Sequence, residues 1–205
     1  MDKKRIVWKE EQGIRYLVFP RLGEAGLPLH AFTARPFDLG FGRKKRGEVL
    51  RDRREVCRVL GINFLLLTAG EQVHGARVAK AGEEARGRGA ISPEGAIRRV
   101  DGFVSNVSEV PLTIFTADCV PIFILDPVGK AIGLVHAGWR GTLGRMSERA
   151  VAMMEETYGS RPEDLIVALG PSIGPCCYQV GEEVMSAFRE QFPDWSSFIS
   201  PDPDG

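Results

Sequence analysis

The sequence predicts a layered domain of the α+β or mixed α/β class. Short strands follow one another as hairpins, and strand–helix crossovers are mixed with them in the second half. The 205 residues are enough to bury one core, and a hydrophobic content of 43% excludes a chain that is disordered by composition. We therefore expect one domain over residues 1–205.

The first half of the chain predicts strands, one helix and a loop. Runs of apolar residues bounded by turn residues indicate the strands. Val49, Val56 and Leu60 share one helical face, and Gly61 supplies a C-terminal stop. Residues 80–99 are rich in Gly, Glu and Arg and predict an exposed, mobile loop. The expected elements are strands at 14–19, 30–34, 64–67 and 77–79 and a helix at 48–60.

The second half predicts closely spaced strands and two helices. A turn with proline at its second position is expected at 126–129. One helix should present a single apolar face made of Leu143, Met146, Ala150, Met154 and Tyr158. The expected elements are strands at 102–105, 110–115, 121–125, 130–135 and 165–169 and helices at 143–158 and 182–191.

The charge balance favours neither nucleic acid nor membrane as a partner. Lys+Arg and Asp+Glu both number 27. The local basic residues at 43–46 and at Arg51, Arg53 and Arg54 are expected on a solvated loop and helix face. No apolar stretch is long enough to span a bilayer, and no signal-peptide core follows the N-terminus. We expect a cytoplasmic protein whose four cysteines are thiols or metal ligands.

Three separate segments each offer one metal ligand: His74 before Gly75, Cys119 after Asp118, and His136 at the end of a strand. Taken singly, a histidine or free cysteine is more often structural. Together they provide two imidazoles and one thiolate. A structural zinc site normally closes with four protein ligands, whereas a catalytic site keeps one position open. If the three residues meet, the pattern predicts a metal-dependent enzyme.

The residues after His136 indicate an anion site. The chain passes from the strand at 130–135 through a glycine-containing turn at 136–142 into a helix. Free N–H groups and the helix dipole at such a turn favour anions. Arg140 adds a guanidinium that suits phosphate or carboxylate, and Trp139 could stack on a planar ring or pack. The ending of a Walker loop is absent.

A fourth segment, residues 170–181, is rich in glycine and proline and predicts a rigid loop after a buried strand. Cys176 and Cys177 are adjacent, and their spacing is not that of a zinc knuckle. We expect them in a pocket wall or in the core.

The four segments, in this order, resemble the YfiH-like family, also called the laccase-domain or polyphenol oxidase family. The resemblance runs from about residue 30 to residue 190, and the strand at Asp101–Val104 also resembles that family's strand before the cysteine. The segments are Gln72-Val73-His74-Gly75, Thr116-Ala117-Asp118-Cys119-Val120-Pro121, His136-Ala137-Gly138-Trp139-Arg140-Gly141-Thr142 and Gly170-Pro171-Ser172-Ile173-Gly174-Pro175-Cys176-Cys177-Tyr178.

The resemblance implies a fold, a metal and a reaction. The fold is a single α+β domain with mixed sheets packed between helix layers, an α-β-β-α sandwich. The metal is zinc, with copper as the other candidate, bound by His74, Cys119 and His136. The reactions are phosphorolysis of adenosine, inosine and methylthioadenosine, and deamination of adenosine, so the partners are a nucleoside and phosphate. The implied catalytic residues are Cys119, Asp118 and Arg140, and the implied substrate and phosphate contacts are Gln72, Gly138, Trp139, Arg140 and Gly141.

The chain departs from the family pattern in two places. The glycine- and serine-rich loop that usually follows the Phe-Thr-x-Arg strand is cut short, because Phe32–Arg35 runs directly into Pro36–Gly40. The family also usually continues for a few tens of residues with a second cysteine–threonine element and a Ser-Tyr-Arg strand. We expect residues 1–205 to lack that C-terminal segment.

Three other functions compete with the nucleoside enzyme. A copper phenol oxidase (laccase) could use two histidines and a cysteine, but a multicopper centre needs further imidazoles and only His30 remains. A metal-free hydrolase could use Cys119 as nucleophile, with His136 or His74 as base. A zinc-stabilised binding protein would close the site with a fourth ligand such as Cys177. No feature of the sequence fixes an oligomeric state.

Overall fold

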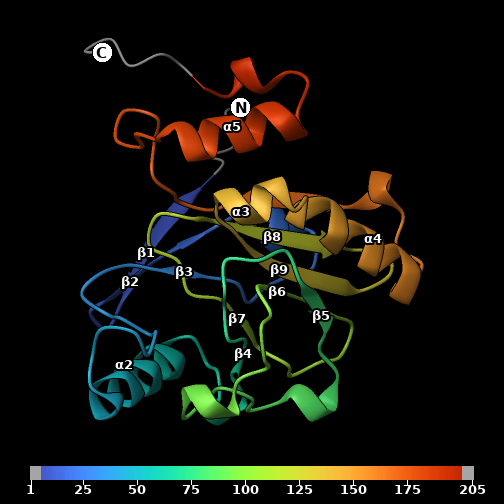
Figure 1. Ribbon diagram of the computed structural model, residues 1–205. Helices are drawn as coiled ribbons and strands as arrows, with labels where there is room; N and C mark the ends of the chain where they lie inside the picture. Colours follow the sequence, from blue (N-terminus) through green and yellow to red (C-terminus); the bar gives the residue numbers. More distant parts are fainter. Residues whose placement is uncertain (1–5, 200–205) are drawn as a thin grey trace.

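Residues 6–199 are described by a computed structural model, and within them the strands form three sheets (Figure 1). The strands are β1 (Val7–Glu11), β2 (Ile14–Val18), β3 (Phe32–Thr33), β4 (Thr68–Ala69), β5 (Val78–Lys80), β6 (Gly102–Ser105), β7 (Leu112–Thr113), β8 (Val120–Asp126), β9 (Ala131–Ala137) and β10 (Ile166–Leu169). The α-helices are α1 (Pro20–Glu24), α2 (Arg46–Val59), α3 (Trp139–Leu143), α4 (Met146–Tyr158) and α5 (Glu182–Gln191). Short 3₁₀ helices lie at Phe64–Leu66, Glu83–Ala85, Pro93–Gly95, Pro162–Asp164 and Trp195–Ser197.

The central sheet has the strand order β10-β8-β9-β6-β5. Its pairs are antiparallel except for β6 and β5, which are parallel. The N-terminal sheet is the antiparallel β1-β2-β3, and the third sheet is the short parallel pair β4-β7. Mixed sheets combined with helices confirm the predicted α+β architecture.

Helix α4 covers one face of the central sheet. Met146, Ala150 and Met154 recur once per helical turn and are all buried. They pack against the apolar face of the sheet, which includes Ile124 of β8 and Val135 of β9. The predicted helical face is therefore the one that the fold uses.

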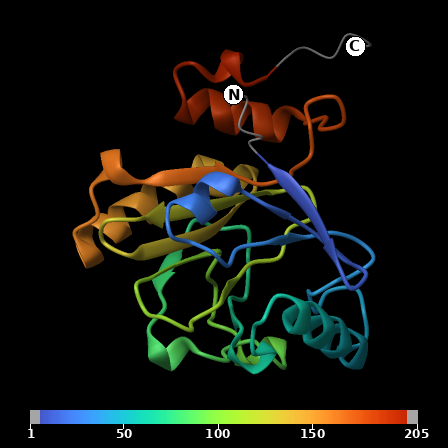
Figure 2. The same cartoon turned by 180° about the vertical axis from the view of Figure 1, so that it is seen from behind.

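The opposite face of the central sheet packs on the N-terminal part of the chain. Leu17 of β2 and Leu22 of α1 are buried against Phe123 and Leu125 of β8. Figure 2 shows α1 lying against this side of the sheet. Because β8 is covered on both faces, its sequence is almost continuously apolar rather than alternating.

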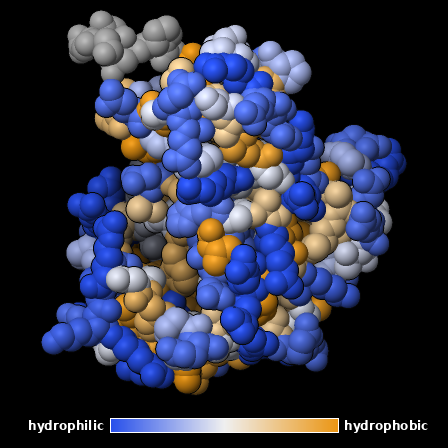
Figure 3. Space-filling model, in the orientation of Figure 1, coloured by the Kyte–Doolittle hydropathy of each residue, from blue (hydrophilic) through white to orange (hydrophobic). Residues whose placement is uncertain are grey.

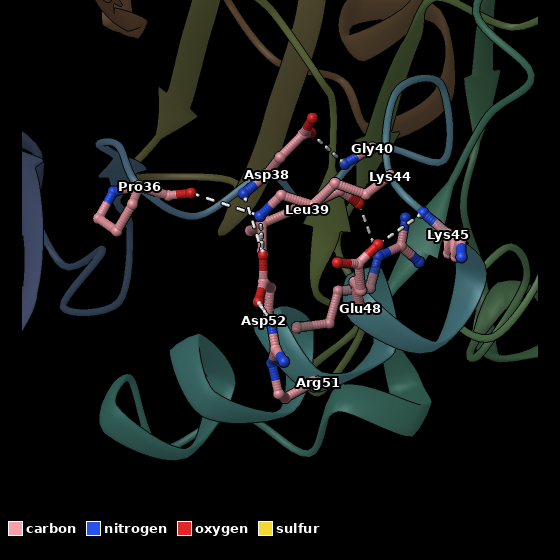
Figure 4. A network of polar contacts seen from close by, with 10 residues as sticks. Pro36, Asp38, Leu39, Gly40, Lys44, Lys45, Glu48, Arg51 and Asp52 are labelled. Atoms are coloured by element: carbon pink, nitrogen blue, oxygen red, sulfur yellow. Dashed lines mark hydrogen bonds and ion pairs between the residues drawn. The ribbon is translucent and has the colours of Figure 1, made fainter.

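The loop that precedes α2 is held to the first turns of that helix. The Asp52 carboxylate pairs with Lys44 and also accepts from the Asp38 backbone N–H, while the Glu48 carboxylate accepts from the Lys45 N–H (Figure 4). Gly40 in turn donates its N–H to the Asp38 side chain. The loop at 36–45, although short, is thus fixed by its own polar contacts.

The prediction of a solvated basic face is wrong for Arg53. Its side chain is 1% exposed, and its guanidinium donates to the carbonyl oxygens of Leu39, Gly89 and Ala90 at 2.6–2.8 Å. Arg51 and Arg54 are exposed, as expected. The helical pattern places Arg53 on the same side as Val49 and Val56. Backbone carbonyls of two loops accept from its Nε and Nη1 atoms, whereas the buried Nη2 atom has no hydrogen-bond partner among the described residues.

Three predicted segments differ from the structure. Residues 64–66 form a 3₁₀ helix rather than a strand, because the Asn63 side chain accepts from the Leu65 N–H and turns the chain. Residues 80–99 are not simply an exposed loop: they include two 3₁₀ helices and buried alanines. The strand expected at 110–115 is confined to β7, residues 112 and 113.

The helix expected at 143–158 begins three residues later, as α4, and it is separated from a further short helix, α3, that ends at Leu143. Arg145 adopts left-handed φ and ψ values of 56° and 46°, which no residue inside an α-helix does. Gly144 lies so close to the turn after His74 that a Cβ atom there would be 2.5 Å from the Ala76 Cβ. The division thus lets α3 approach that turn.

A cavity of about 800 Å³ lies between the N-terminal sheet, α2 and the segment around β7. Its apolar lining includes Phe32, Phe37, Val56, Phe115 and Leu134. Figure 3 shows the molecular surface hollowed on the side where β3 lies in Figure 1. Within residues 6–199, none of the helices has the length and apolar character needed to cross a membrane.

Candidate metal centre

The three predicted ligands meet in space. His136 lies in β9 opposite Pro121, and Cys119 directly precedes β8, so the two residues are close neighbours at one end of the β8–β9 hairpin. His74 comes from the turn between β4 and β5. One ligand atom from each of the three residues can be chosen so that all lie within 4.8 Å of one another. Among the residues that the structure describes, this is the group of three that could hold a metal ion.

His74 occupies an unusual backbone conformation. Its φ is 56°, in the left-handed region that costs a non-glycine residue about 1–2 kcal/mol. The side chain is exposed, and its ring centroid is 4.9 Å from that of the buried His136, with the ring planes at 77°. Backbone strain of this kind persists only where other contacts hold it, and it is frequent at functional sites.

Those contacts come from Asp101, which precedes β6 and is fully buried. One carboxylate oxygen is 3.0 Å from His136 Nδ1 and accepts from the His74 N–H at 2.9 Å. The other accepts from the N–H groups of Gly75 at 2.9 Å and Val73 at 3.2 Å. The Asp101 carbonyl also accepts from the His136 N–H at 2.8 Å. The sequence predicts Asp101 only as part of a strand and does not reveal this role; an acidic residue directly before a buried strand is the one signal that points to it.

The electrostatics of the site follow from burial and these contacts. Burial alone raises the pKa of Asp101, but hydrogen bonds from His136, Gly75 and Val73 outweigh it and hold this pKa below its usual value. Burial raises the pKa of the Cys119 thiol, and the nearby negative charges of Asp118 and Asp101 raise it further. Cys119 without a bound cation is therefore a thiol at neutral pH, and a cation would favour its thiolate.

Glycines in the turn after His136 allow that turn to lie close to the segments that carry Cys119 and His74. A Cβ atom on Gly138 would lie 2.9 Å from Cys119 Sγ and 3.5 Å from His74 Cδ2. A Cβ atom on Gly141 would lie 3.2 Å from the Gly75 carbonyl oxygen. Both predicted glycines therefore allow close approach of α3 to the ligand segments.

The remaining predicted residues surround this centre in different ways. Arg140 is exposed, stacks on the Trp139 ring at 4.0 Å and makes a 3.4 Å contact with Glu183 of α5. Asp118 is exposed next to Cys119, and its carbonyl accepts from the Ile173 N–H at 2.9 Å. These contacts leave the Arg140 and Asp118 side chains open to solvent.

The Gln72 side chain is engaged with the protein backbone. Its amide nitrogen donates to the Phe115 carbonyl at 2.9 Å, and its amide oxygen accepts from the Phe115 N–H at 2.7 Å. This double contact ties the segment carrying His74 to the segment that leads to Cys119. A contact between Gln72 and a substrate stays a prediction.

The core position expected as one alternative for the two adjacent cysteines is wrong. Cys176 and Cys177 are exposed rather than in the core, with their sulfur atoms 3.1 Å apart. Cys177 is not one of the three residues of the metal-binding group. The centre therefore has no fourth cysteine ligand among the described residues.

The third histidine is committed elsewhere. His30 Nε2 accepts from the Phe19 N–H at 2.8 Å, and its Nδ1 donates to the Leu27 carbonyl at 2.9 Å. Burial lowers the pKa of His30, which keeps the ring neutral. With both nitrogens used, His30 is a structural residue.

Comparison with known proteins identifies the family. The sequence profile described as "Multi-copper polyphenol oxidoreductase laccase" matches residues 29–204, well over half of the chain. The chain belongs to this family. The predicted laccase-domain (YfiH-like) resemblance is thereby confirmed.

Curated relatives and solved structures of the laccase-domain family agree with this assignment. Purine nucleoside phosphorylase YlmD of Geobacillus stearothermophilus is 38% identical over 148 residues, which cover 72% of this chain and 54% of that protein. Adenosine deaminase RL5, from an unknown prokaryotic organism, is 35% identical over 69% of this chain and 54% of its own length. The crystal structure of Bacillus licheniformis hypothetical protein YfiH superposes with a TM-score of 0.84 and 25% identity, covering 95% of this chain and 78% of that one. The chain thus spans about half the length of the curated relatives that it matches.

The donor set of this laccase-domain chain fits a metal ion. Two imidazoles and a thiolate suit zinc or copper. Ligands of a tetrahedral zinc lie roughly 3.5 Å apart, given bond lengths of about 2.0–2.3 Å. The observed separations of up to 4.8 Å require only small side-chain movements to reach that geometry. With Nδ1 of His136 facing Asp101, the Nε2 atom is the one free to bind a metal.

Proposed function

We propose that this laccase-domain chain forms part of a zinc-dependent purine nucleoside phosphorylase. The observation that carries the proposal is the group of His74, Cys119 and His136, which has no fourth protein ligand among residues 6–199; three protein ligands are typical of catalytic rather than structural zinc. The names of the curated relatives supply the substrate class. Bound zinc would polarise an oxygen or nitrogen atom of the substrate.

In phosphorolysis, an oxygen of phosphate forms a bond to C1′ of the ribose. The C1′–N9 bond breaks, and the purine leaves with the electron pair and gains a proton. Arg140 is the proposed phosphate ligand, because its exposed guanidinium makes, within the described part of the chain, a 3.4 Å contact to Glu183 and a stacking contact with the Trp139 ring. Gly138 and Gly141 keep the turn close to the metal ligands, and Asp118, beside Cys119, is the proposed proton carrier.

We propose deamination of adenosine as a second reaction of the same site. A relative of similar identity is named adenosine deaminase. In this reaction a water oxygen forms a bond to C6 of the purine and ammonia leaves. The His-x-Glu and Pro-Cys-x-x-Cys pattern of the cytidine deaminases is absent, so the constellation here would be a different one.

Two competing functions have weaker support. A multicopper oxidase needs several further imidazole ligands. Both ring nitrogens of His30 form hydrogen bonds with backbone groups, so this histidine is not free to bind copper. A metal-free Cys119 nucleophile would need a lowered pKa, whereas burial, Asp118 and Asp101 all raise the pKa of this thiol. Zinc coordination of Cys119 removes that difficulty, because a coordinated thiol loses its proton.

The test is release of purine base by protein loaded with one equivalent of zinc. We expect hypoxanthine from inosine and adenine from adenosine only when phosphate is present. His136→Ala should lower the rate by about 100-fold or more, because it removes one of three zinc ligands. Cys176→Ser, an exposed thiol outside the group, is the matched control and should retain the rate. No base release at stoichiometric zinc, or phenol oxidation by the copper-loaded protein instead, would count against the proposal.

A further inference from the structure

One buried carboxylate reaches both histidine segments of the centre. The Asp101 carboxylate accepts hydrogen bonds from three successive backbone N–H groups, those of Val73, His74 and Gly75. Successive N–H groups around a left-handed residue form a concave anion site, and here the protein's own carboxylate fills it. The position of the His74 turn therefore depends on the negative charge of Asp101.

The same carboxylate fixes which nitrogen of His136 carries a proton. An ionised carboxylate can only accept, so the 3.0 Å contact between Asp101 Oδ1 and His136 Nδ1 places the proton on Nδ1. The lone pair of the neutral ring is then on Nε2. Partners of this kind raise the basicity of a histidine ligand and fix its orientation.

We propose that Asp101 is the positioning residue of the metal centre. It holds the His74 turn and selects the His136 tautomer, so that two of the three ligands are arranged before a metal binds. The inference rests on the proposed metal-dependent function, but it concerns the metal-free protein as well. Asp101 has 0% exposure and so does not contact substrate; it acts only through the two histidines.

Asp101→Asn tests the charge with almost no change of shape. In one amide orientation the NH₂ group faces the Val73 and Gly75 N–H groups, and in the other it faces the His74 N–H and His136 Nδ1. In the first orientation the amide NH₂ group, a donor, faces two backbone N–H groups, which are also donors, so both hydrogen bonds to the turn are lost. The second also favours the His136 tautomer with its proton on Nε2, where a metal would bind. Either way, we expect zinc affinity to fall by about 10–100-fold.

Asp126→Asn is the matched control. Asp126 is equally buried, at 1% exposure, and its carboxylate also accepts backbone N–H groups, those of Val128 and Gly129. It lies at the far end of the β8–β9 hairpin from His136, five residues or roughly 16 Å along the strand. The control removes a buried carboxylate without touching the histidines, and its zinc affinity should equal that of the wild type.

Two measurements are needed. Zinc affinity is determined by competition with a chromophoric chelator, and the His136 tautomer by ¹⁵N–¹H NMR of the metal-free proteins. The wild type should carry the imidazole proton on Nδ1. In Asp101→Asn this preference should weaken, because the second amide orientation opposes one backbone N–H group rather than two and is therefore the better populated. The wild-type spectrum provides a test even if Asp101→Asn does not fold.

The proposal is overturned by a wild-type proton on Nε2, by a folded Asp101→Asn protein with zinc affinity within threefold of wild type, or by an equal loss in Asp126→Asn. A wild type that has the Nδ1 proton and yet binds no zinc would instead refute the proposed function while supporting the positioning role.

Discussion

Arg53 illustrates how a single buried charge can hold a loop and a helix together. Its guanidinium lies between the rings of Phe41 and Phe115, at 4.2 and 5.0 Å from their centroids. It also donates to carbonyl oxygens of the 36–45 loop and of the segment at 89–90. Burial lowers the pKa of Arg53 to about 10, so the group remains charged at pH 7. Aromatic faces and carbonyl dipoles take the place of water around it.

Arg53→Lys should destabilise the protein by about 3 kcal/mol, because an ammonium cannot reproduce the planar, multiple donation of a guanidinium. Urea unfolding at 25 °C measures the change in the free energy of unfolding. Arg51→Lys is the control, since the Arg51 side chain is 68% exposed and its ion pair with Asp52 is worth about 0.2–1 kcal/mol. Equal stabilities for the two variants would mean that the Arg53 contacts contribute little.

At the residue scale, the sequence identifies ligands better than the residues that support them. His74, Cys119 and His136 can be found because three segments each offer one imidazole or thiolate ligand, and because these segments together resemble one family. Asp101 and Arg53 are common charged residues, and charge normally indicates a surface position. Their burial depends on backbone groups supplied by other segments, and such groups leave no mark in a single sequence.

At the scale of elements, the β8–β9 hairpin combines a predicted turn with an interaction that the turn pattern does not reveal. Asp126 Oδ1 accepts from Val128 and Gly129 at 2.9 and 2.7 Å. Burial by itself raises the pKa of Asp126, but the neighbouring Ser160 side chain together with these two backbone hydrogen bonds outweighs it, so the folded pKa lies below its usual value. The ionised form therefore stabilises the hairpin.

The sign of the pH effect follows from this lowered pKa. The stabilisation is fully present above the unfolded pKa, about 3.9, and is lost as the pH falls through the folded pKa. Asp126→Asn should therefore cost about 1 kcal/mol at pH 7, and the difference from wild type should shrink once the pH is below the unfolded pKa and disappear as the pH falls through the lower folded pKa. Urea unfolding of both proteins from pH 7 downward measures this. A difference that stays constant or grows in acid would show that the charge is not the stabilising feature.

Helices and strands with a clear spacing of apolar residues could be predicted from the sequence. The predictions failed where local contacts override that spacing. Helix α5 begins and ends at the predicted residues, and α2 begins two residues earlier than expected and ends one earlier. Phe64–Leu66 has the composition of a strand, yet the Asn63 cap turns it into a 3₁₀ helix. The apolar face of α4 was correct, but the division at Gly144 depends on packing against Ala76, a contact that its own sequence does not encode.

At the scale of the whole molecule, the metal centre joins segments that are distant in the chain. His74 lies between β4 and β5, Cys119 before β8, and His136 within β9. An ion held by all three connects the central sheet to the turn after the short β4-β7 sheet. Ligand binding to the folded state alone stabilises it in proportion to the logarithm of ligand concentration. The centre should therefore contribute to global stability as well as to chemistry.

We expect zinc at 100 times its dissociation constant to stabilise the fold by about 2.7 kcal/mol and to raise the melting temperature by roughly 5–10 °C. Differential scanning calorimetry with zinc, and again after chelation, measures this shift. His136→Ala should abolish it, because the two ligands that remain in the folded state would bind zinc no better than the unfolded chain does. The exposed neighbours Cys176 and Cys177 could also bind zinc, so the double variant Cys176→Ser, Cys177→Ser serves as the control and should keep the full shift.

If the double variant loses the shift while His136→Ala retains it, zinc stabilises the protein through the exposed thiols, and the three-segment centre does not link the sheets.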